Sequence, residues 1–125
     1  MPLRGVRGAI TVPANDAQFI ERCTQELLQA AIQRNHIRLE DIAAILFAVT
    51  PDLNAAFPAS AARKLGMERV ALLDFTSPAV EGALERVVRM LLLWNTELSQ
   101  QEIHHVYLGD AAKLRPDLCE GGFPQ

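Results

Sequence analysis

Hydrophobic and polar residues alternate along this chain in patterns that predict both strands and helices. The segment Leu3–Val12 alternates loosely and is rich in Val, Ile and Thr, which is typical of a strand. Between Asp16 and Arg34, apolar residues recur at helical spacing and predict an amphipathic helix. Asn15 and Gln18 fit a capping pair at its start. The continuous apolar run Ile42–Val49 predicts a buried strand.

The second half of the chain predicts one further helix and three more strands. A helix is expected over Pro58–Leu65, because proline suits a first helical turn and Gly66 suits the residue after a helix. The segment Leu84–Trp94 would be apolar almost all round as a helix, so a strand is favoured. The other expected elements are a strand Arg69–Leu73, a loop Asp74–Gly82, a capped turn Ser99–Glu102 and a strand His104–Leu108.

This order of elements indicates an α+β fold with one mixed sheet and helices on one of its faces. We expect a single domain over residues 1–118, followed by a flexible C-terminal tail over residues 119–125. With so much apolar strand and so few helices, the second face of the sheet lacks a cover within the chain. A second copy of the chain is the natural cover, so the sequence predicts an oligomer.

Composition excludes several classes of partner. The 125 residues carry a net charge of −3 and show no basic stripe, so no nucleic acid is expected to bind. The apolar runs are too short to cross a bilayer, so no membrane partner is expected. The N-terminus has no apolar signal core, which predicts a cytoplasmic protein.

Arg89 is the residue that most constrains function. It interrupts the apolar run Val87–Trp94, where we expect it on one face of the strand with Val87, Leu91 and Leu93. A guanidinium is costly to bury without an anion. By itself Arg89 therefore indicates a structural ion pair, a stem that reaches solvent, or a pocket for an anionic ligand.

The known motifs for nucleophilic, acid–base and metal chemistry are absent from the sequence. The adjacent His104 and His105 would point to opposite faces of a strand, so no zinc site is expected. Since the conventional cofactor-binding motifs are also missing, no cofactor is expected. Arg4 and Arg7 also face opposite sides of a regular strand, so only one of them can share a pocket with Arg89.

Several short segments follow one another in an order and spacing typical of a known family: Arg4–Val12, Thr50–Leu53, Ala56–Ala59, Ala62–Arg63, Val87–Met90, Trp94–Thr96, His105–Leu108 and Leu114–Leu118. Together they cover residues 3–118 and resemble the AroH-type chorismate mutases, the trimeric Bacillus class. This resemblance implies that the chain rearranges chorismate to prephenate on the route to phenylalanine and tyrosine. It further implies a homotrimer that forms a pseudo α/β-barrel, with three active sites at the subunit interfaces.

The resemblance also implies roles for individual residues. Arg89 matches the cation placed against the ether oxygen of the breaking bond, and Arg7 and Tyr107 match residues that contact a substrate carboxylate. Phe57, Ala59 and Arg63 match residues that the neighbouring subunit contributes. Further residues expected to contact the substrate are Leu73, Leu114 and Arg115. A unimolecular rearrangement needs no nucleophile, acid, base or metal. This agrees with the absence of motifs for such chemistry from the sequence.

The sequence departs from the family pattern in the loop before Arg89. The family has a glutamate at the position of Ser77, and often a cysteine at the position of Asp74. One hypothesis is that Asp74 supplies the missing carboxylate, accepts a hydrogen bond from the substrate hydroxyl and orients Arg89. The other is that the site is degraded and the chain is a weak enzyme or a non-catalytic, anion-binding trimer. A deaminase-like trimer that hydrolyses imines or enamines is an alternative from another class of enzyme.

Overall fold

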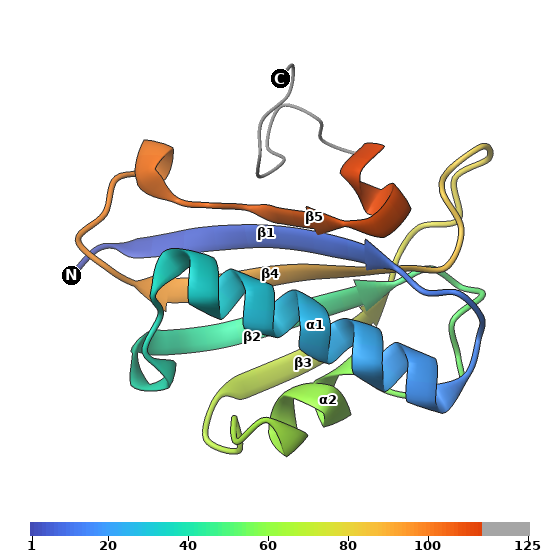
Figure 1. The fold of residues 1–125 in the computed structure, drawn as a ribbon, viewed down its shortest axis with the longest axis horizontal. Coiled ribbons are helices and arrows are strands. Elements are labelled where there is room, and N and C mark those ends of the chain that lie inside the picture. Colours follow the sequence, from blue (N-terminus) through green and yellow to red (C-terminus); the bar gives the residue numbers. More distant parts are fainter. Residues whose placement is uncertain (114–125) are drawn as a thin grey trace.

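The computed structural model describes residues 1–113, which form one mixed five-stranded sheet with both α-helices on the same face (Figure 1). The α-helices and strands, in chain order, are β1 (Leu3–Thr11), α1 (Ala17–Asn35), β2 (Ile42–Val49), α2 (Pro58–Lys64), β3 (Ala71–Thr76), β4 (Val87–Asn95) and β5 (Val106–Leu108). Three short 3-10 helices lie at Leu39–Asp41, Gln100–Glu102 and Gly109–Lys113. The predicted α+β class and the mixed sheet are therefore confirmed.

The strand order in the sheet is β3-β2-β4-β1-β5. The central strand β4 runs antiparallel to both β1 and β2, whereas β3 pairs parallel with β2 and β5 pairs parallel with β1. This order places β1 between β4 and β5, so that residues from these three strands can line a common site.

The hydrophobic core lies between the sheet and the two helices. Alternate residues of each strand point into it, including Phe47 of β2 and Leu92 of β4, which are fully buried. Helix α1 approaches β1 closely at Gly8, where an added Cβ would lie 3.0 Å from Leu27 of α1 and from Met90 of β4. A larger residue at position 8 would force these side chains and the Val106 carbonyl, also 3.0 Å away, to shift, so the close packing favours glycine here.

The start of α1 differs in detail from the prediction. The N-cap is Asp16, whose carboxylate accepts the N–H of Phe19 at 3.1 Å, and not Asn15. The Asn15 side chain instead accepts the N–H groups of Asn54 and Ala55, at 3.0 and 3.1 Å. Asn15 thus ties the start of α1 to the loop before α2, a long-range contact that short-range capping rules do not predict.

Two strands have bounds that alter the reading of the site. Strand β3 covers Ala71–Thr76 and not Arg69–Leu73, so Asp74 lies within a strand and not in a loop. The parallel ladder with β2 extends to the pair Val49 and Thr76, which explains the longer strand. The predicted strand over Leu84–Trp94 is confirmed as β4, but it begins at Val87, after Arg86 with φ of 49°. The predicted capping box of Ser99 and Glu102 is confirmed.

Candidate active site

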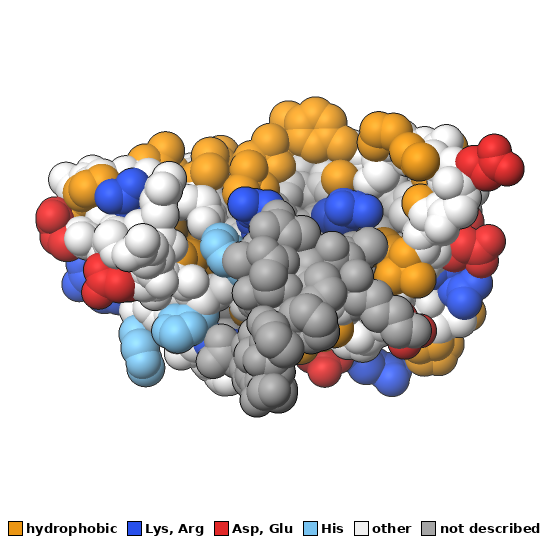
Figure 2. All heavy atoms as spheres, turned by 90° about the horizontal axis from the view of Figure 1, so that it is seen from above, with side chains coloured by type: hydrophobic (Ala, Val, Ile, Leu, Met, Phe, Trp, Pro, Cys, Tyr) orange, Lys and Arg blue, Asp and Glu red, His pale blue; other side chains and the backbone are white. Residues whose placement is uncertain are grey.

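The face of the sheet turned away from the helices carries an unusual number of exposed apolar side chains. In Figure 2 hydrophobic side chains gather along this face, with cationic side chains beside them. Leu73 is 54% exposed, Phe75 is 47% exposed and Leu91 is 39% exposed. No described element covers them, so this face is available for another chain.

A cavity of about 310 Å³ opens on this face. Residues of all five strands line it, and none of the described lining residues is acidic. They are Arg7, Gly8, Ala9, Leu46, Phe47, Ala48, Phe75, Arg89, Met90, Leu91 and Tyr107. Apolar walls with two cations and a phenol are suited to an anionic ligand that also has an apolar body.

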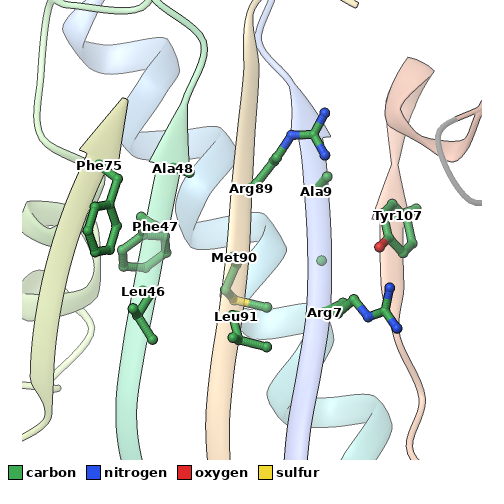
Figure 3. Close-up of a pocket in the computed structure, with 11 residues that line it drawn as sticks. Arg7, Ala9, Leu46, Phe47, Ala48, Phe75, Arg89, Met90, Leu91 and Tyr107 are labelled. Carbon is green, nitrogen blue, oxygen red and sulfur yellow. The ribbon is translucent and has the colours of Figure 1, made fainter. Parts of the chain in front are cut away.

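The register of the strands places the two arginines in this cavity. Arg89 pairs with Ala9 on β1 and with Ala48 on β2, and both neighbours have small side chains that leave room above them. Arg7 lies two residues before Ala9 and therefore faces the same side. In Figure 3 the Arg89 guanidinium extends over β1 beside Ala9, and the Arg7 guanidinium extends toward Tyr107 on β5.

Neither Arg7 nor Arg89 forms an ion pair with any described residue, because the ion pairs in this part of the chain involve other cations. The predicted face of Arg89 and Leu91 is confirmed, but both side chains are exposed in the single chain. The structural ion pair considered for Arg89 is therefore not formed within residues 1–113. Two alternatives remain, a stem that reaches solvent and a cation available to an anionic ligand, and the place of Arg89 on the cavity wall favours the second.

Arg4 lies on the other side of β1, as the odd spacing from Arg7 predicts. Its Nε donates to the carbonyl of Leu98 at 2.9 Å, which fixes the chain after β4. Arg7 is thus the β1 arginine that shares the cavity with Arg89.

Asp74 does not face this cavity. It pairs with Phe47, and both point to the helix face of the sheet, whereas Arg89 is on the opposite face with Ala48. The Asp74 carboxylate accepts the backbone N–H of Ala59 at 3.1 Å, at the start of α2. The hypothesis that Asp74 orients Arg89 is therefore wrong within one chain, because the sheet separates the two side chains.

The environment of Asp74 perturbs its ionisation. Partial burial raises the pKa of the carboxyl above its usual value, while the Ala59 N–H and the positive charge of Arg63 act in the opposite direction. Arg63 itself donates to the Ser60 hydroxyl at 3.1 Å. Asp74 is therefore a carboxyl that binds the backbone of α2, at a cost in solvation.

Phe57, Ala59 and Arg63 lie at or within α2, on the helix side of the sheet, and do not line the cavity of Arg89. Phe57 is 70% exposed and lines a second hollow with Asp74 and Phe75. Leu73 is on the same face of the sheet as Arg89, but it lies on β3, the edge strand at the far side from β5. The structure thus divides the predicted site residues into two groups, one around β1, β4 and β5 and one around α2 and β3.

Ser77 follows β3 and is held by its backbone, since its N–H donates to the carbonyl of Val49 at 2.7 Å. Its hydroxyl is buried and has no hydrogen-bond partner among the described residues. It provides no carboxylate near Arg89. Leu114 and Arg115, which were also predicted to contact the substrate, lie outside the described residues, as does the predicted tail.

Sequence reasoning missed the apolar residues that line the cavity, namely Ala9, Leu46, Phe47, Ala48, Phe75, Met90 and Leu91. Phe75 was hidden because β3 was predicted to end before it. Within residues 1–113, no cluster of His, Cys, Asp and Glu could hold a metal ion. No helix among these residues is long and apolar enough to span a membrane.

Comparisons with known proteins agree with the resemblance seen in the sequence. The family model for chorismate mutase type I matches residues 3–118. The chain is 50% identical to chorismate mutase AroH of Thermus thermophilus over 117 residues, which cover 93% of this chain and 96% of the relative. It is 40% identical to chorismate mutase AroH of Bacillus subtilis over 119 residues, or 94% of each chain.

A solved structure supports the same relationship. The chorismate mutase from Clostridium thermocellum superposes with a TM-score of 0.86 at 41% identity, covering 87% of this chain and 97% of that one. These similarities extend over the elements that carry Arg7, Arg89 and Tyr107. They favour the mutase over the deaminase-like alternative.

Proposed function

The chain belongs to the type I chorismate mutase family and is an isomerase of aromatic amino acid biosynthesis that converts chorismate to prephenate; we propose that it does so as a homotrimer, in sites completed by a neighbouring chain. A cytoplasmic location is part of this proposal and follows from the biosynthetic role.

The observation that carries the proposal is the pair of arginines, Arg7 and Arg89, in one cavity that no described acid lines. Chorismate is a dianion, and guanidinium groups bind carboxylates in bidentate geometry. Tyr107 pairs with Ala9 on the adjacent strand, two residues after Arg7, and the Arg7 side chain extends toward it. In this proposal Arg7 and Tyr107 bind one carboxylate. This contact holds the substrate in its compact conformer and so lowers the entropic part of the barrier.

Arg89 has a different role in the proposed mechanism. During the rearrangement the breaking ether bond places negative charge on its oxygen. A fixed cation that faces this oxygen stabilises the transition state more than the ground state, which is the condition for a faster chemical step. One preorganised donor of this kind contributes about 3–4 kcal/mol. Arg89 has no competing anion among the described residues, so its charge is available to the substrate.

The proposed trimer rests on two features of the single chain. Apolar residues of β3 and β4 remain exposed on the sheet face that carries the cavity. In addition, Phe57, Ala59 and Arg63 are separated from Arg89 by the sheet, yet the family pattern assigns them to one site. A neighbouring chain that packs on the exposed face would bring its own Phe57–Arg63 segment to the cavity, together with Leu73. Leu114 and Arg115 would help to close the site.

In this arrangement Asp74 is a positioning residue and not a catalytic one. Its carboxylate holds the N–H of Ala59, and Ala59 lies between Phe57 and Arg63 in the segment offered to the neighbour. Asp74 would then influence catalysis through the placement of α2. The family glutamate position, Ser77, would contribute no charge to the site.

A subunit-mixing experiment tests the interfacial site. Arg89→Ala and Arg63→Glu variants, each expected to be nearly inactive alone, are co-expressed with different tags, and mixed trimers are purified through both tags. Every mixed trimer then contains a site with an intact Arg89 half and an intact Arg63 half, so chorismate mutase activity should return. If mixed trimers stay as inactive as the parents, each site lies within one chain and the interfacial proposal fails.

A further inference from the structure

The backbone of Arg7 is held by a side chain from the other end of the described chain. The N–H of Arg7 donates to Nδ1 of His105 at 2.9 Å, across a sequence separation of 98 residues. The parallel ladder of β1 and β5 begins one residue later, at the pair Gly8 and Val106. The imidazole therefore continues the hydrogen-bonding of β1 beyond the end of the β5 ladder.

The position of His105 is itself fixed from α1. Asn35, the last residue of α1, is buried, and its amide group binds the backbone of His104 twice. Asn35 Nδ2 donates to the His104 carbonyl at 2.8 Å, and the His104 N–H donates to Asn35 Oδ1 at 2.8 Å. The residue before His105 is thus clamped, so the ring is presented to β1 from a defined backbone.

The contact also fixes the state of the ring. A neutral imidazole has one nitrogen that donates and one that accepts, whereas an imidazolium has two donors and no acceptor. Since Nδ1 accepts the N–H of Arg7, the single ring proton of His105 must be on Nε2. The contact is therefore specific for one tautomer of neutral histidine.

We propose that His105 is a positioning residue for substrate binding, which holds the backbone of Arg7 so that its guanidinium is aimed into the cavity beside Tyr107. The inference rests on the proposed role of Arg7 in binding a substrate carboxylate. His105 and Tyr107 lie two residues apart on the same short segment, so one segment both presents the phenol and fixes the arginine. His105 does not itself line the cavity and acts only through Arg7. Its effect should therefore appear mainly in the affinity for substrate, with a smaller effect on kcat through the placement of the substrate carboxylate.

Two substitutions at His105 separate the hydrogen bond from the bulk of the ring. In His105→Asn, an amide oxygen bonded to Cγ takes the place of Nδ1 and can accept the same N–H. In His105→Leu, a side chain of similar bulk offers no acceptor. We expect His105→Leu to raise KM for chorismate about five- to tenfold, the factor that one lost hydrogen bond produces, with kcat within about twofold of wild type. His105→Asn should keep KM within about twofold of wild type.

The exposed neighbour provides a matched control, since His104→Leu removes an imidazole without touching the Arg7 contact and should leave KM unchanged. An unchanged KM in His105→Leu would overturn the inference. So would an equal loss in His105→Asn and His105→Leu, or a loss confined to kcat.

The tautomer gives a readout that does not depend on activity or on a variant that folds. Long-range ¹H–¹⁵N spectra of the wild-type protein at pH 8 should show His105 with a bare Nδ1 and a protonated Nε2. A proton on Nδ1 would overturn the inference. If the wild type did not convert chorismate at all, the proposed function would fail, while this spectrum would still decide whether His105 holds Arg7.

Discussion

The carboxylate of Asp74 binds the backbone N–H of Ala59 at 3.1 Å and so connects β3 to the first turn of α2. The two residues are 15 positions apart, and the contact lies on the opposite face of the sheet from Arg89. An acidic residue at this place therefore fixes the geometry of a helix start. It does not supply a charge to the cation of the same chain.

Substitution of Asp74 should affect activity through this hydrogen bond. We expect Asp74→Ala to lower kcat/KM for chorismate by about three- to tenfold, because Ala59 loses an acceptor worth about 0.5–1.5 kcal/mol. Asp74→Asn retains an acceptor oxygen and should stay within about twofold of wild type. Steady-state kinetics on the three proteins measure the difference.

Ser77→Ala is the control for Asp74, because the Ser77 hydroxyl has no partner among the described residues and its loss should change kcat/KM by less than about twofold. Equal losses in Asp74→Asn and Asp74→Ala would show that the negative charge itself matters, which would contradict a role through the Ala59 N–H.

The raised pKa of Asp74 predicts a pH dependence of stability. Burial raises the pKa in the folded chain above the ordinary value of 3.8, so in the window above 3.8 the folded state binds more protons than the unfolded state. The free energy of unfolding therefore falls as pH rises through this window, and this loss of stability remains at higher pH. Asp74→Asn removes the titration. Urea titrations give the free energy of unfolding of Asp74→Asn minus that of wild type. This difference should increase from pH 3.5 to neutrality.

A difference between Asp74→Asn and wild type that stays constant over this range, or that decreases with rising pH, would show that the Ala59 N–H and Arg63 outweigh burial. Asp16 also accepts a backbone N–H at a helix start, but it is exposed to solvent. Asp16→Asn is therefore a suitable second reference for the same titration.

Arg89 and Arg63, which belong to different groups of the predicted site residues, should differ in how much activity is lost when each is replaced. Arg89→Lys moves the cation away from the ether oxygen and loses the fork geometry, so kcat should fall by about 10²-fold or more. Arg63→Lys keeps a cation on α2, in the segment proposed to come from the neighbour, and should cost less. Parallel measurements of kcat and KM decide between them, and the reverse order would move the main catalytic cation to α2.

The exposed apolar face predicts association. Leu73→Glu places a charge on this face, where Leu73 is 54% exposed in the single chain, and should reduce the mass measured by light scattering from trimer to monomer. Val80→Glu introduces the same charge at a residue that is 64% exposed but lies in the loop after β3. It should leave the trimer intact, and dissociation by both variants or by neither would contradict an interface on this face.

Periodicity in the sequence was sufficient to predict most of the fold. The apolar runs that became β2 and β4 are recognisable because their side chains meet a core on at least one face. The common face of Arg89 and Leu91 follows from the two-residue repeat of a strand, and Arg7 and Tyr107 were placed by family resemblance.

The residues that were misplaced depend on contacts between distant parts of the chain. Asp74 reads as a loop residue because aspartate is disfavoured in strands, and only the Ala59 N–H explains its presence in β3. The Asn15 contact with the loop before α2 and the His105 contact with Arg7 are also long-range. Patterns of local sequence contain no information about such pairs, so they cannot be predicted by local rules.

The central claim is that fixed cations, Arg89 above all, supply the electrostatic part of the catalysis, with no metal, cofactor or ionisable base. The most direct measurement is the loss of chorismate absorbance catalysed by purified protein in EDTA from pH 6 to pH 9, beside Arg89→Ala. We predict conversion to prephenate with kcat nearly constant over this range, and a loss of about 10²–10³-fold or more in Arg89→Ala. No conversion above the uncatalysed rate, or equal rates for wild type and Arg89→Ala, would contradict the account.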